Sequence, residues 1–242
     1  MKNNMKNEKS EVPSMQKISD VTSVISHQLK TPLAGIKSSL EILSSGDLGP
    51  LNKEQQEYVE LTLGSAGKMI SLVRDLLDAS RIDENRFVLN PGKSDIAELV
   101  GETIKELGSF AQAKNTRITL NRAGTIPPLM IDGLKVRQVI SNILYNAIRY
   151  NRGKGTIEIT LENKGDHVLF SCKDSGIGIS DEDKKMIFNK FYRSSRVISL
   201  APDGTGLGLY ISKAIIEGSG GTIGFKSDEG KGTTFYFTLP IQ

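Results

Sequence analysis

The chain has 242 residues, of which 24% are charged and 38% hydrophobic, and its formal net charge is +3. This length is enough for two domains, and the composition is that of a globular protein. The small net charge and the lack of a Lys/Arg stripe argue against a nucleic-acid partner. A single cysteine, Cys172, excludes an internal disulfide and a cysteine-based metal site, and its apolar surroundings predict a small core residue.

No apolar run approaches the ~20 residues that cross a bilayer, and the polar start lacks the hydrophobic region of a signal peptide. We therefore expect no membrane contact by this segment and a cytoplasmic location. The same features suit the soluble part of a longer, membrane-anchored protein. Residues 1–13 are charged and rich in asparagine, which predicts a disordered N-terminal segment.

The first predicted helix runs from about Ser14 to Leu43, with apolar residues that recur in steps of three and four along one stripe. At about 100° per residue, His27 falls on the opposite face, and Thr31 follows one turn later on that face. An imidazole on the outside of a helix is available to a reagent, although a lone histidine is usually an ordinary surface residue. Pro32 lacks a backbone donor and predicts a kink just past the histidine.

A turn rich in Gly, Asp and Pro follows, and Asn52 can cap a second helix with Gln55 as its capping-box partner. That helix is expected to fade near Arg81, which gives a hairpin with arms of about 30 residues, or about 45 Å. Two helices alone cannot cover both apolar stripes, so we predict a homodimer in which two hairpins form a four-helix bundle. A packed helical pair without catalysis is an equally sound interpretation, except for the exposed histidine.

Residues 83–93 form a polar connection containing Pro91-Gly92, and we place the domain boundary there, between residues 14–90 and 91–242. Helices are expected beyond it at residues 94–113 with Ser94 as cap, 132–150 with Asp132 as cap, 181–189 and 205–217. Strands are expected at residues 117–120, 128–131, 156–161, 167–173, 221–226 and 233–239, with a polar loop at 193–203. Helices and mostly antiparallel strands without a strict βαβ alternation predict an α+β two-layer sandwich.

Two glycine-rich motifs in this second half can contact a ligand. The first, Asp174-Ser175-Gly176-Ile177-Gly178-Ile179, follows a strand, and its carboxyl group can accept a hydrogen bond from an exocyclic amine beside glycines that let a flat ligand approach. Asp-x-Gly sequences are also common in ordinary turns. The second, Gly204-Thr205-Gly206-Leu207-Gly208-Leu209, leads into a helix whose free N–H groups suit phosphate, or it forms a flexible cap. A Rossmann site fails because no strand precedes the motif in a βαβ unit.

The third motif is a helix face that carries Asn142 and Asn146, four residues apart, with Arg149 three residues further. Asparagine is a poor residue inside a helix, so two on one face indicate a function. Amide oxygens together with water suit Mg²⁺, which usually arrives with nucleotide phosphates. Two solvated amides are the alternative interpretation.

The order of these motifs resembles the catalytic core of the sensor histidine kinases of two-component systems, over about residues 14–239. The matching segments are Ser26–Pro32 for the H box, residues 142–151 for the N box, 174–178 for the G1 box, 188–193 for the F box and 204–208 for the G2 box. This resemblance implies that His27 accepts a phosphoryl group from ATP and passes it to an aspartate on a response-regulator receiver domain.

The resemblance also implies the roles of the nucleotide-site residues. Asn146 would ligate Mg²⁺ with Asn142 beside it, and Asp174 would bind the adenine amino group with help from Thr233. The pocket lining and phosphate contacts would come from Tyr150, Arg149, Arg193 and the glycine-box residues Gly176, Gly178, Ile179, Gly204, Thr205, Gly206, Leu207 and Gly208. Residues 194–203 would form a mobile ATP lid hinged at the glycines of the G2 box.

One departure from the family pattern stands beside the histidine. Family members most often carry Glu or Asp there, and this chain has Gln28. An amide can hydrogen-bond the ring but cannot usefully accept its proton, so we expect slowed autophosphorylation. Thr31 stands where the family positions a hydrolytic water, which implies phosphatase activity toward the regulator.

Three alternatives are weaker. ATPases of the gyrase and mismatch-repair kind resemble the N and G boxes, but they place a catalytic Glu where this chain has Asn142, and they lack the hairpin with His27. A dimeric scaffold that binds nucleotide without turnover is supported by Gln28 alone. A protein-serine kinase of the same superfamily leaves the H box unexplained.

Overall fold

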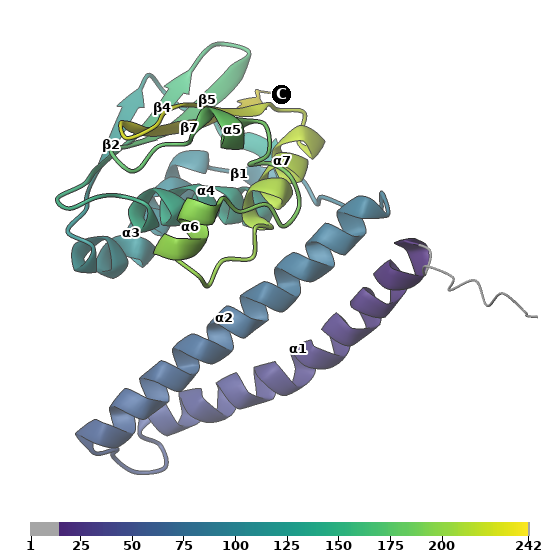
Figure 1. Ribbon diagram of the computed structural model, residues 1–242, viewed down its shortest axis with the longest axis vertical. Coiled ribbons are helices and arrows are strands. Elements are labelled where there is room, and N and C mark those ends of the chain that lie inside the picture. Colours follow the sequence, from purple (N-terminus) through teal and green to yellow (C-terminus); the bar gives the residue numbers. More distant parts are fainter. Residues whose placement is uncertain (1–14, 242) are drawn as a thin grey trace, which may run out of the picture. The chain divides into compact units, whose positions relative to one another are not determined.

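The computed structural model describes residues 15–241, and it describes side chains from Gln28 onward. The chain divides into two compact units, Met1–Arg86 and Phe87–Gln242 (Figure 1). This division falls inside the polar connection predicted at residues 83–93. The assignment of separate functions to residues 14–90 and 91–242 stays a prediction, and the segment predicted to be disordered, 1–13, lies outside the described residues.

The first unit is a helical hairpin. Helix α1 (Met15–Ser45) continues through Pro32 and is bowed, and α2 (Lys53–Asp83) packs along it (Figure 1). The predicted capping box is present, since the Asn52 side chain accepts the Gln55 N–H and the Gln55 side chain accepts the Asn52 N–H, both at 2.9 Å. The hairpin leaves large apolar side chains exposed, namely Leu29, Ile36, Ile42, Leu43, Tyr58, Leu61, Met69 and Leu72.

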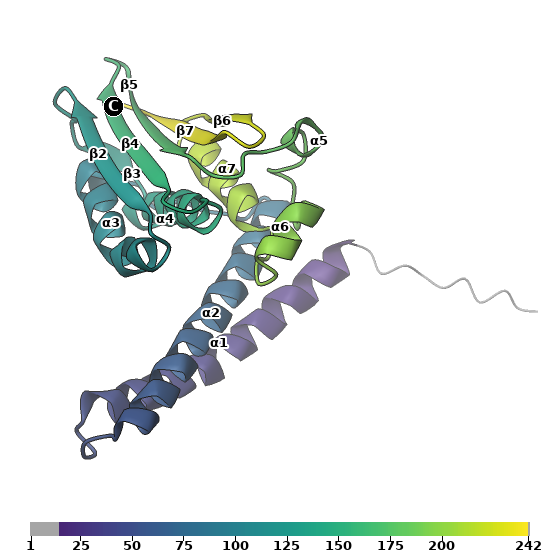
Figure 2. The ribbon, with the colours of Figure 1, turned by 60° about the vertical axis from the view of Figure 1, so that its left-hand side comes forward.

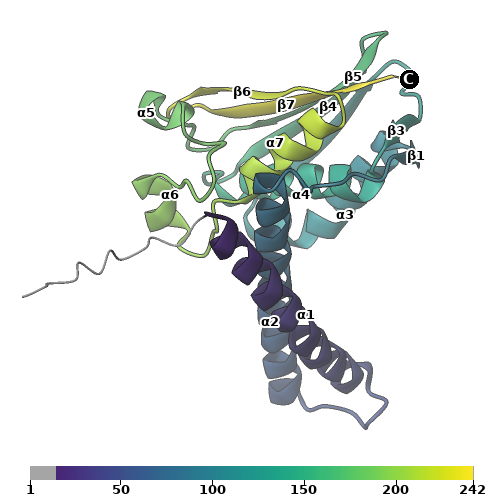
Figure 3. The ribbon, with the colours of Figure 1, turned by 90° about the vertical axis from the view of Figure 1, so that its right-hand side faces the viewer.

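The second unit is a two-layer sandwich (Figures 2 and 3). One layer is a five-stranded sheet in the order β2-β4-β5-β7-β6, in which β2 and β4 are parallel and the other pairs antiparallel. Its strands are β2 (Arg117–Ala123), β4 (Thr156–Asn163), β5 (His167–Asp174), β6 (Ile223–Asp228) and β7 (Gly232–Pro240). The other layer contains α3 (Ile96–Ala113), α4 (Gly133–Arg149) and α7 (Gly208–Gly218), and it lies on one face of the sheet.

The core lies between these layers. The alternation along the strands and the helical repeat along α4 both place apolar side chains on the inner faces. Alternate residues of β4 and β5 are buried, and so is one face of α4. Phe170 on β5 pairs with Phe237 on β7, and their rings stack at 4.6 Å between centroids. Cys172 is buried, as predicted. A helical hairpin followed by an α+β two-layer sandwich is therefore confirmed within the described residues.

Several predicted element boundaries are wrong for local reasons. Ser94 does not cap α3, because it belongs to β1 (Gly92–Ser94), an unpredicted strand that pairs with β3 (Leu129–Ile131). The cap is Asp95, whose carboxylate accepts the N–H groups of Ala97 and Glu98.

The other boundary errors lie around the predicted lid. Helix α5 (Asp181–Lys184) ends five residues before the predicted position, 189. The loop predicted at 193–203 contains α6 (Ser195–Leu200), because the Ser194 hydroxyl caps it. Helix α7 begins at Gly208 rather than 205, because Gly206 has a φ of +71°, which is incompatible with a helix start before it. Among the described helices, none has the length and apolarity needed to cross a membrane.

Candidate functional site

Asp174 ends strand β5 and carries a buried carboxyl group with one open oxygen. Its Oδ1 accepts the backbone N–H groups of Gly176, at 2.8 Å, and Thr233, at 3.2 Å. Within the described part of the chain, Oδ2 has no hydrogen-bond donor. Burial raises the pKa of Asp174, and the two backbone N–H bonds only partly oppose that shift. The open oxygen is therefore a strong acceptor for a donor group on a ligand.

The glycines that follow Asp174 lie directly against neighbouring backbone. A Cβ on Gly176 would lie 2.5 Å from the carbonyl oxygen of Tyr150, at the end of α4. Gly178 has a φ of +67°, and a Cβ there would collide with the carbonyl of Asp228. The loop is therefore fixed between α4 and the turn that joins β6 to β7, and no larger residue fits these two positions.

The hydroxyl group of Ser227 anchors the same loop. The Ser227 hydroxyl accepts the Ile179 N–H at 2.9 Å and lies 2.9 Å from the hydroxyl of Thr233. Thr233 is buried, and its N–H donates to Asp174, while its helper role toward adenine stays a prediction. Ser227 was not predicted, because nothing in the local sequence indicates that β6 lies against this loop.

The two asparagines of α4 meet, as their spacing predicted. The amide nitrogen of Asn146 donates to Asn142 Oδ1 at 3.4 Å, and the Asn142 amide nitrogen donates to Ser212 Oγ on α7 at 3.0 Å. Gly208 lies so close to Asn142 that a Cβ would collide with its amide. In the described part of the chain, Asn146 Oδ1 receives no hydrogen bond, so this oxygen is available to a ligand.

Arg149 lies at the last turn of α4 between aromatic rings and an acidic group. Its guanidinium carbon lies 5.8 Å from the ring centroids of both Tyr145 and Tyr150, and its Nη2 lies 2.7 Å from Asp203 Oδ1. Burial raises the pKa of Tyr150, while the positive charges of Arg149 and Arg193 oppose that shift. The last turn of α4 therefore faces a small region that is surrounded by Arg149, Tyr150, Arg193 and Asp203.

Arg193 is bonded to the backbone of the predicted lid. Its guanidinium donates to the carbonyl oxygens of Pro202 at 2.7 Å and Gly204 at 2.9 Å, and also to that of Ala201. In addition to the Arg149–Asp203 ion pair, the lid residue Arg196 forms an ion pair with Glu229 at 2.7 Å. The partners Asp203 and Glu229 were not predicted, because ion pairs between distant segments leave no periodic signal in the sequence.

The G2 motif combines a tight turn with an uncapped helix start. Gly206 has a φ of +71°, and its carbonyl accepts the Phe191 N–H at 3.0 Å. The Thr205 hydroxyl accepts the Leu207 N–H at 3.3 Å, and Leu207 is buried. Helix α7 starts at Gly208, and Leu207 supplies no side-chain cap, so the first N–H groups of an 11-residue helix can bind an anion.

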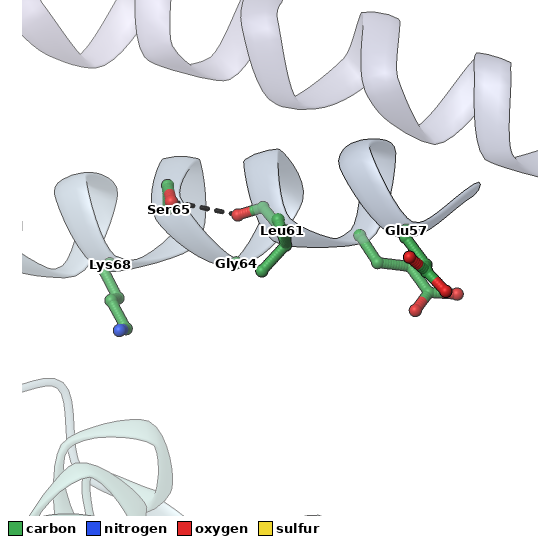
Figure 4. A pocket seen from close by; sticks show the side chains of 6 residues that line it. Glu57, Leu61, Gly64, Ser65 and Lys68 are labelled. Atoms are coloured by element: carbon green, nitrogen blue, oxygen red, sulfur yellow. Dashed lines mark hydrogen bonds between the residues drawn. The ribbon is translucent and has the colours of Figure 1, made fainter. Parts of the chain in front are cut away.

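A hollow in the first unit is a separate feature (Figure 4). All six of its lining residues come from α2: Glu57, Glu60, Leu61, Gly64, Ser65 and Lys68. The Ser65 hydroxyl donates to the Leu61 carbonyl within the helix at 2.9 Å. This surface contains none of the predicted site residues.

Two family models match the chain. Residues 17–85 match the His Kinase A (phospho-acceptor) domain, and residues 131–242 match the histidine kinase-, DNA gyrase B- and HSP90-like ATPase family. Together these matches identify a histidine kinase catalytic core. The ATPase match lies in the second unit, and the residues described above for the predicted nucleotide site all lie within it.

Relatives of this histidine kinase core include two curated proteins. Sensor protein GacS of Pseudomonas syringae pv. syringae is 34% identical over 223 residues, which are 90% of this chain and 24% of GacS. Sensor histidine kinase WalK of Bacillus subtilis is 34% identical over 229 residues, 90% of this chain and 36% of WalK. The chain thus spans about a quarter to a third of these relatives. A crystal structure of full-length ShkA in complex with AMPPNP has a TM-score of 0.71 and 27% identity, covering 92% of this chain and 46% of ShkA.

The H box of this histidine kinase lies in the first unit. His27 belongs to α1 and to the range matched by the phospho-acceptor model, but its side chain lies outside the described ones. Gln28 and Thr31 follow in the same helix with exposed side chains. The structure therefore brings together the predicted residues of the nucleotide site within the second unit, and the pairing of that site with His27 stays a prediction.

Proposed function

We propose that this chain is an ATP-dependent protein-histidine kinase that autophosphorylates on His27 and transfers the phosphoryl group to an aspartate of a response regulator. One observation carries the proposal. A single chain joins a phospho-acceptor domain containing His27 to an ATPase domain in which the buried Asp174 carboxyl group has an open oxygen. Neither part alone would make a histidine kinase.

The nucleotide is held at both ends. Asp174 Oδ2 accepts the adenine amino group, with Thr233 beside it and Tyr150 lining the pocket. The backbone of Gly176, Gly178 and Ile179 lies against the base. The phosphates lie at the start of α7, where the residues of the G2 box are Gly204, Thr205, Gly206, Leu207 and Gly208. The uncapped N–H groups of α7 support this orientation, because a helix N-terminus attracts an anion.

The residues also fit Mg²⁺. Asn146 offers a free amide oxygen, a hard ligand, and Asn142 fixes its orientation through the hydrogen bond between the two amides. The described residues contain no cluster of three or more His, Cys, Asp or Glu, which suits an ion that is held mostly by substrate phosphates and water. When bound, Mg²⁺ neutralises negative charge on the phosphates, and Arg149 and Arg193 add positive charge to the same region.

The reaction is a transfer of one phosphoryl group. A nitrogen of the His27 ring forms a bond to the γ-phosphorus while the bond from that phosphorus to the β–γ bridging oxygen breaks, and ADP leaves. The ring proton goes to water, because Gln28 can orient the ring but cannot take its proton. Catalysis then depends on positioning and on charge stabilisation, and the missing carboxylate slows it.

The hairpin provides the surfaces for two protein partners. Its exposed apolar side chains support a homodimer that buries them in a four-helix bundle. The exposed outer face of α1 next to His27 offers access for a receiver domain, and the exposed Thr31 supports phosphatase activity toward that domain.

Labelling with Mg-[γ-³²P]ATP tests the proposal, because the chain has two histidines and the second provides a matched control. We expect acid-labile label on the wild type and on His167→Gln, and none on His27→Gln. Equal labelling of His27→Gln would contradict the proposal. Steady ATP hydrolysis without phosphoprotein would instead support an ATPase.

A further inference from the structure

Residues 201–204, at the end of the lid and the start of the G2 box, bind the two arginines that nucleotide phosphates are expected to use. The Arg193 guanidinium binds the backbone carbonyls of Ala201, Pro202 and Gly204, which lie on both sides of Asp203. The Asp203 carboxylate binds Arg149 at 2.7 Å. The carbonyl bonds therefore hold in place the residue that carries the negative charge.

The ion pair is partly sheltered from water. The Arg149 side chain is 12% exposed, whereas that of Asp203 is 60% exposed. The guanidinium carbon also lies 5.8 Å from the ring centroids of Tyr145 and Tyr150, and neither of these contacts involves the lid. A carboxylate can thus leave Arg149 by a movement of the lid alone, while the arginine stays at the nucleotide site.

We propose that Asp203 competes with nucleotide phosphate for Arg149 and thereby lowers the affinity of the site for ATP and ADP. Carboxylate and phosphate oxygens bind a guanidinium group in the same way, so an arriving phosphate must displace Asp203 before it can bind Arg149. The inference rests on the proposed nucleotide site. In this proposal, the Asp203 carboxylate competes with the phosphates of the ligand for Arg149 and does not affect the binding of the base.

The competition predicts an effect on ligands that carry phosphates and none on adenosine. Removal of the Asp203 charge strengthens the binding of ATP and ADP, while adenosine binds as before. A partly exposed ion pair contributes modestly, so we expect a gain of about fivefold in affinity for ATP. The exposed position of Asp203 makes the Asp203→Asn variant compatible with folding.

The experiment is a calorimetric titration of the 242-residue chain with Mg-ATP, Mg-ADP and adenosine. Asp203→Asn should bind both nucleotides about fivefold more tightly and adenosine unchanged. Glu229→Gln is the matched control, since it removes the same charge from the ion pair that Arg196 makes with the other part of the lid. This control should leave the ratio of ATP to adenosine affinity at the wild-type value.

A double variant assigns the effect to Arg149. In the Arg149→Gln background, Asp203→Asn should no longer change ATP affinity, because the shared partner is gone. Unchanged ATP affinity in Asp203→Asn, or an equal gain for adenosine, would overturn the inference. Failure of the proposed nucleotide site itself would appear differently, as absent ATP binding by the wild type.

Discussion

The Asp174→Asn substitution separates the proposed adenine-binding role of this residue from its structural role. Asparagine keeps a side-chain oxygen for the N–H groups of Gly176 and Thr233, but it places an NH₂ group where Oδ2 was. The adenine amino donor then faces another donor. A hydrogen bond to a charged group contributes about 1.5–3 kcal/mol, so ATP binding should weaken by about 10- to 150-fold.

At neutral pH the Asp174→Asn variant should be more stable than the wild type, although it binds ATP more weakly. Burial raises the pKa of Asp174, so the folded state favours the neutral carboxyl group, and that contribution is lost as the pH rises through the raised pKa. Wild-type protein at pH 7 therefore carries the cost of a buried charge that the asparagine variant lacks. We expect a higher free energy of unfolding for Asp174→Asn at pH 7, and a difference that shrinks as the pH approaches the ordinary carboxyl range.

Asp174→Ala provides the contrast, because it leaves two buried N–H groups without their acceptor. Each unsatisfied group costs about 1–3 kcal/mol, so this variant should lose both ATP binding and stability. Calorimetric titration with ATP and urea unfolding at several pH values measure the two effects. ATP affinity within twofold of wild type in Asp174→Asn would refute the assignment of Oδ2 to the adenine amino group.

Three further outcomes are expected. Gln28→Glu should speed autophosphorylation of His27, by up to the roughly 10²–10⁴-fold that a general base contributes, and an unchanged rate of ³²P incorporation would remove the role assigned to Gln28. Thr31→Ala should slow dephosphorylation of a phosphorylated receiver domain, whereas an unaltered rate would exclude Thr31 from that step. Gly206→Ala should lower the free energy of unfolding by about 1–3 kcal/mol, because its φ is +71° and a Cβ would lie 2.6 Å from the carbonyl carbon of Phe191. Gly230 has a φ of +79° but open space where a Cβ would lie, so Gly230→Ala should lose less stability than Gly206→Ala. Equal losses in urea unfolding would show that crowding of the Gly206 Cβ contributes nothing.

Elements with a clear period or a cap signal could be predicted from the sequence. The Asn52–Gln55 capping box and the Asp132 cap of α4 were found because their partners lie within three residues. The alternation in β4 and β5 located both strands. Strand β1 was missed because three residues contain no detectable alternation, and its identity depends on pairing with β3, far along the chain.

The candidate site shows the same limit. The meeting of Asn142 and Asn146 follows from helical spacing, so the sequence was sufficient to predict it. The bonds from Asn142 to Ser212 and from Arg149 to Asp203 join segments separated by 70 and 54 positions. No local pattern specifies such partners, because they depend on how α4, the lid and α7 pack together.

Two carboxylates in the second unit are expected to affect the binding of different parts of the nucleotide. Asp174 offers an acceptor to the adenine amino group, and guanine carries a carbonyl oxygen at that position, so wild-type protein should prefer ATP to GTP. Asp203 opposes the phosphates, which the two nucleotides share. Asp174→Asn should therefore narrow the gap between ATP and GTP affinities, while Asp203→Asn should raise both by the same factor. Because the two effects concern different ligand atoms, the double variant should show their sum within about 0.3–0.5 kcal/mol. A larger deviation from additivity in competition titrations would mean that the lid also affects the binding of the base.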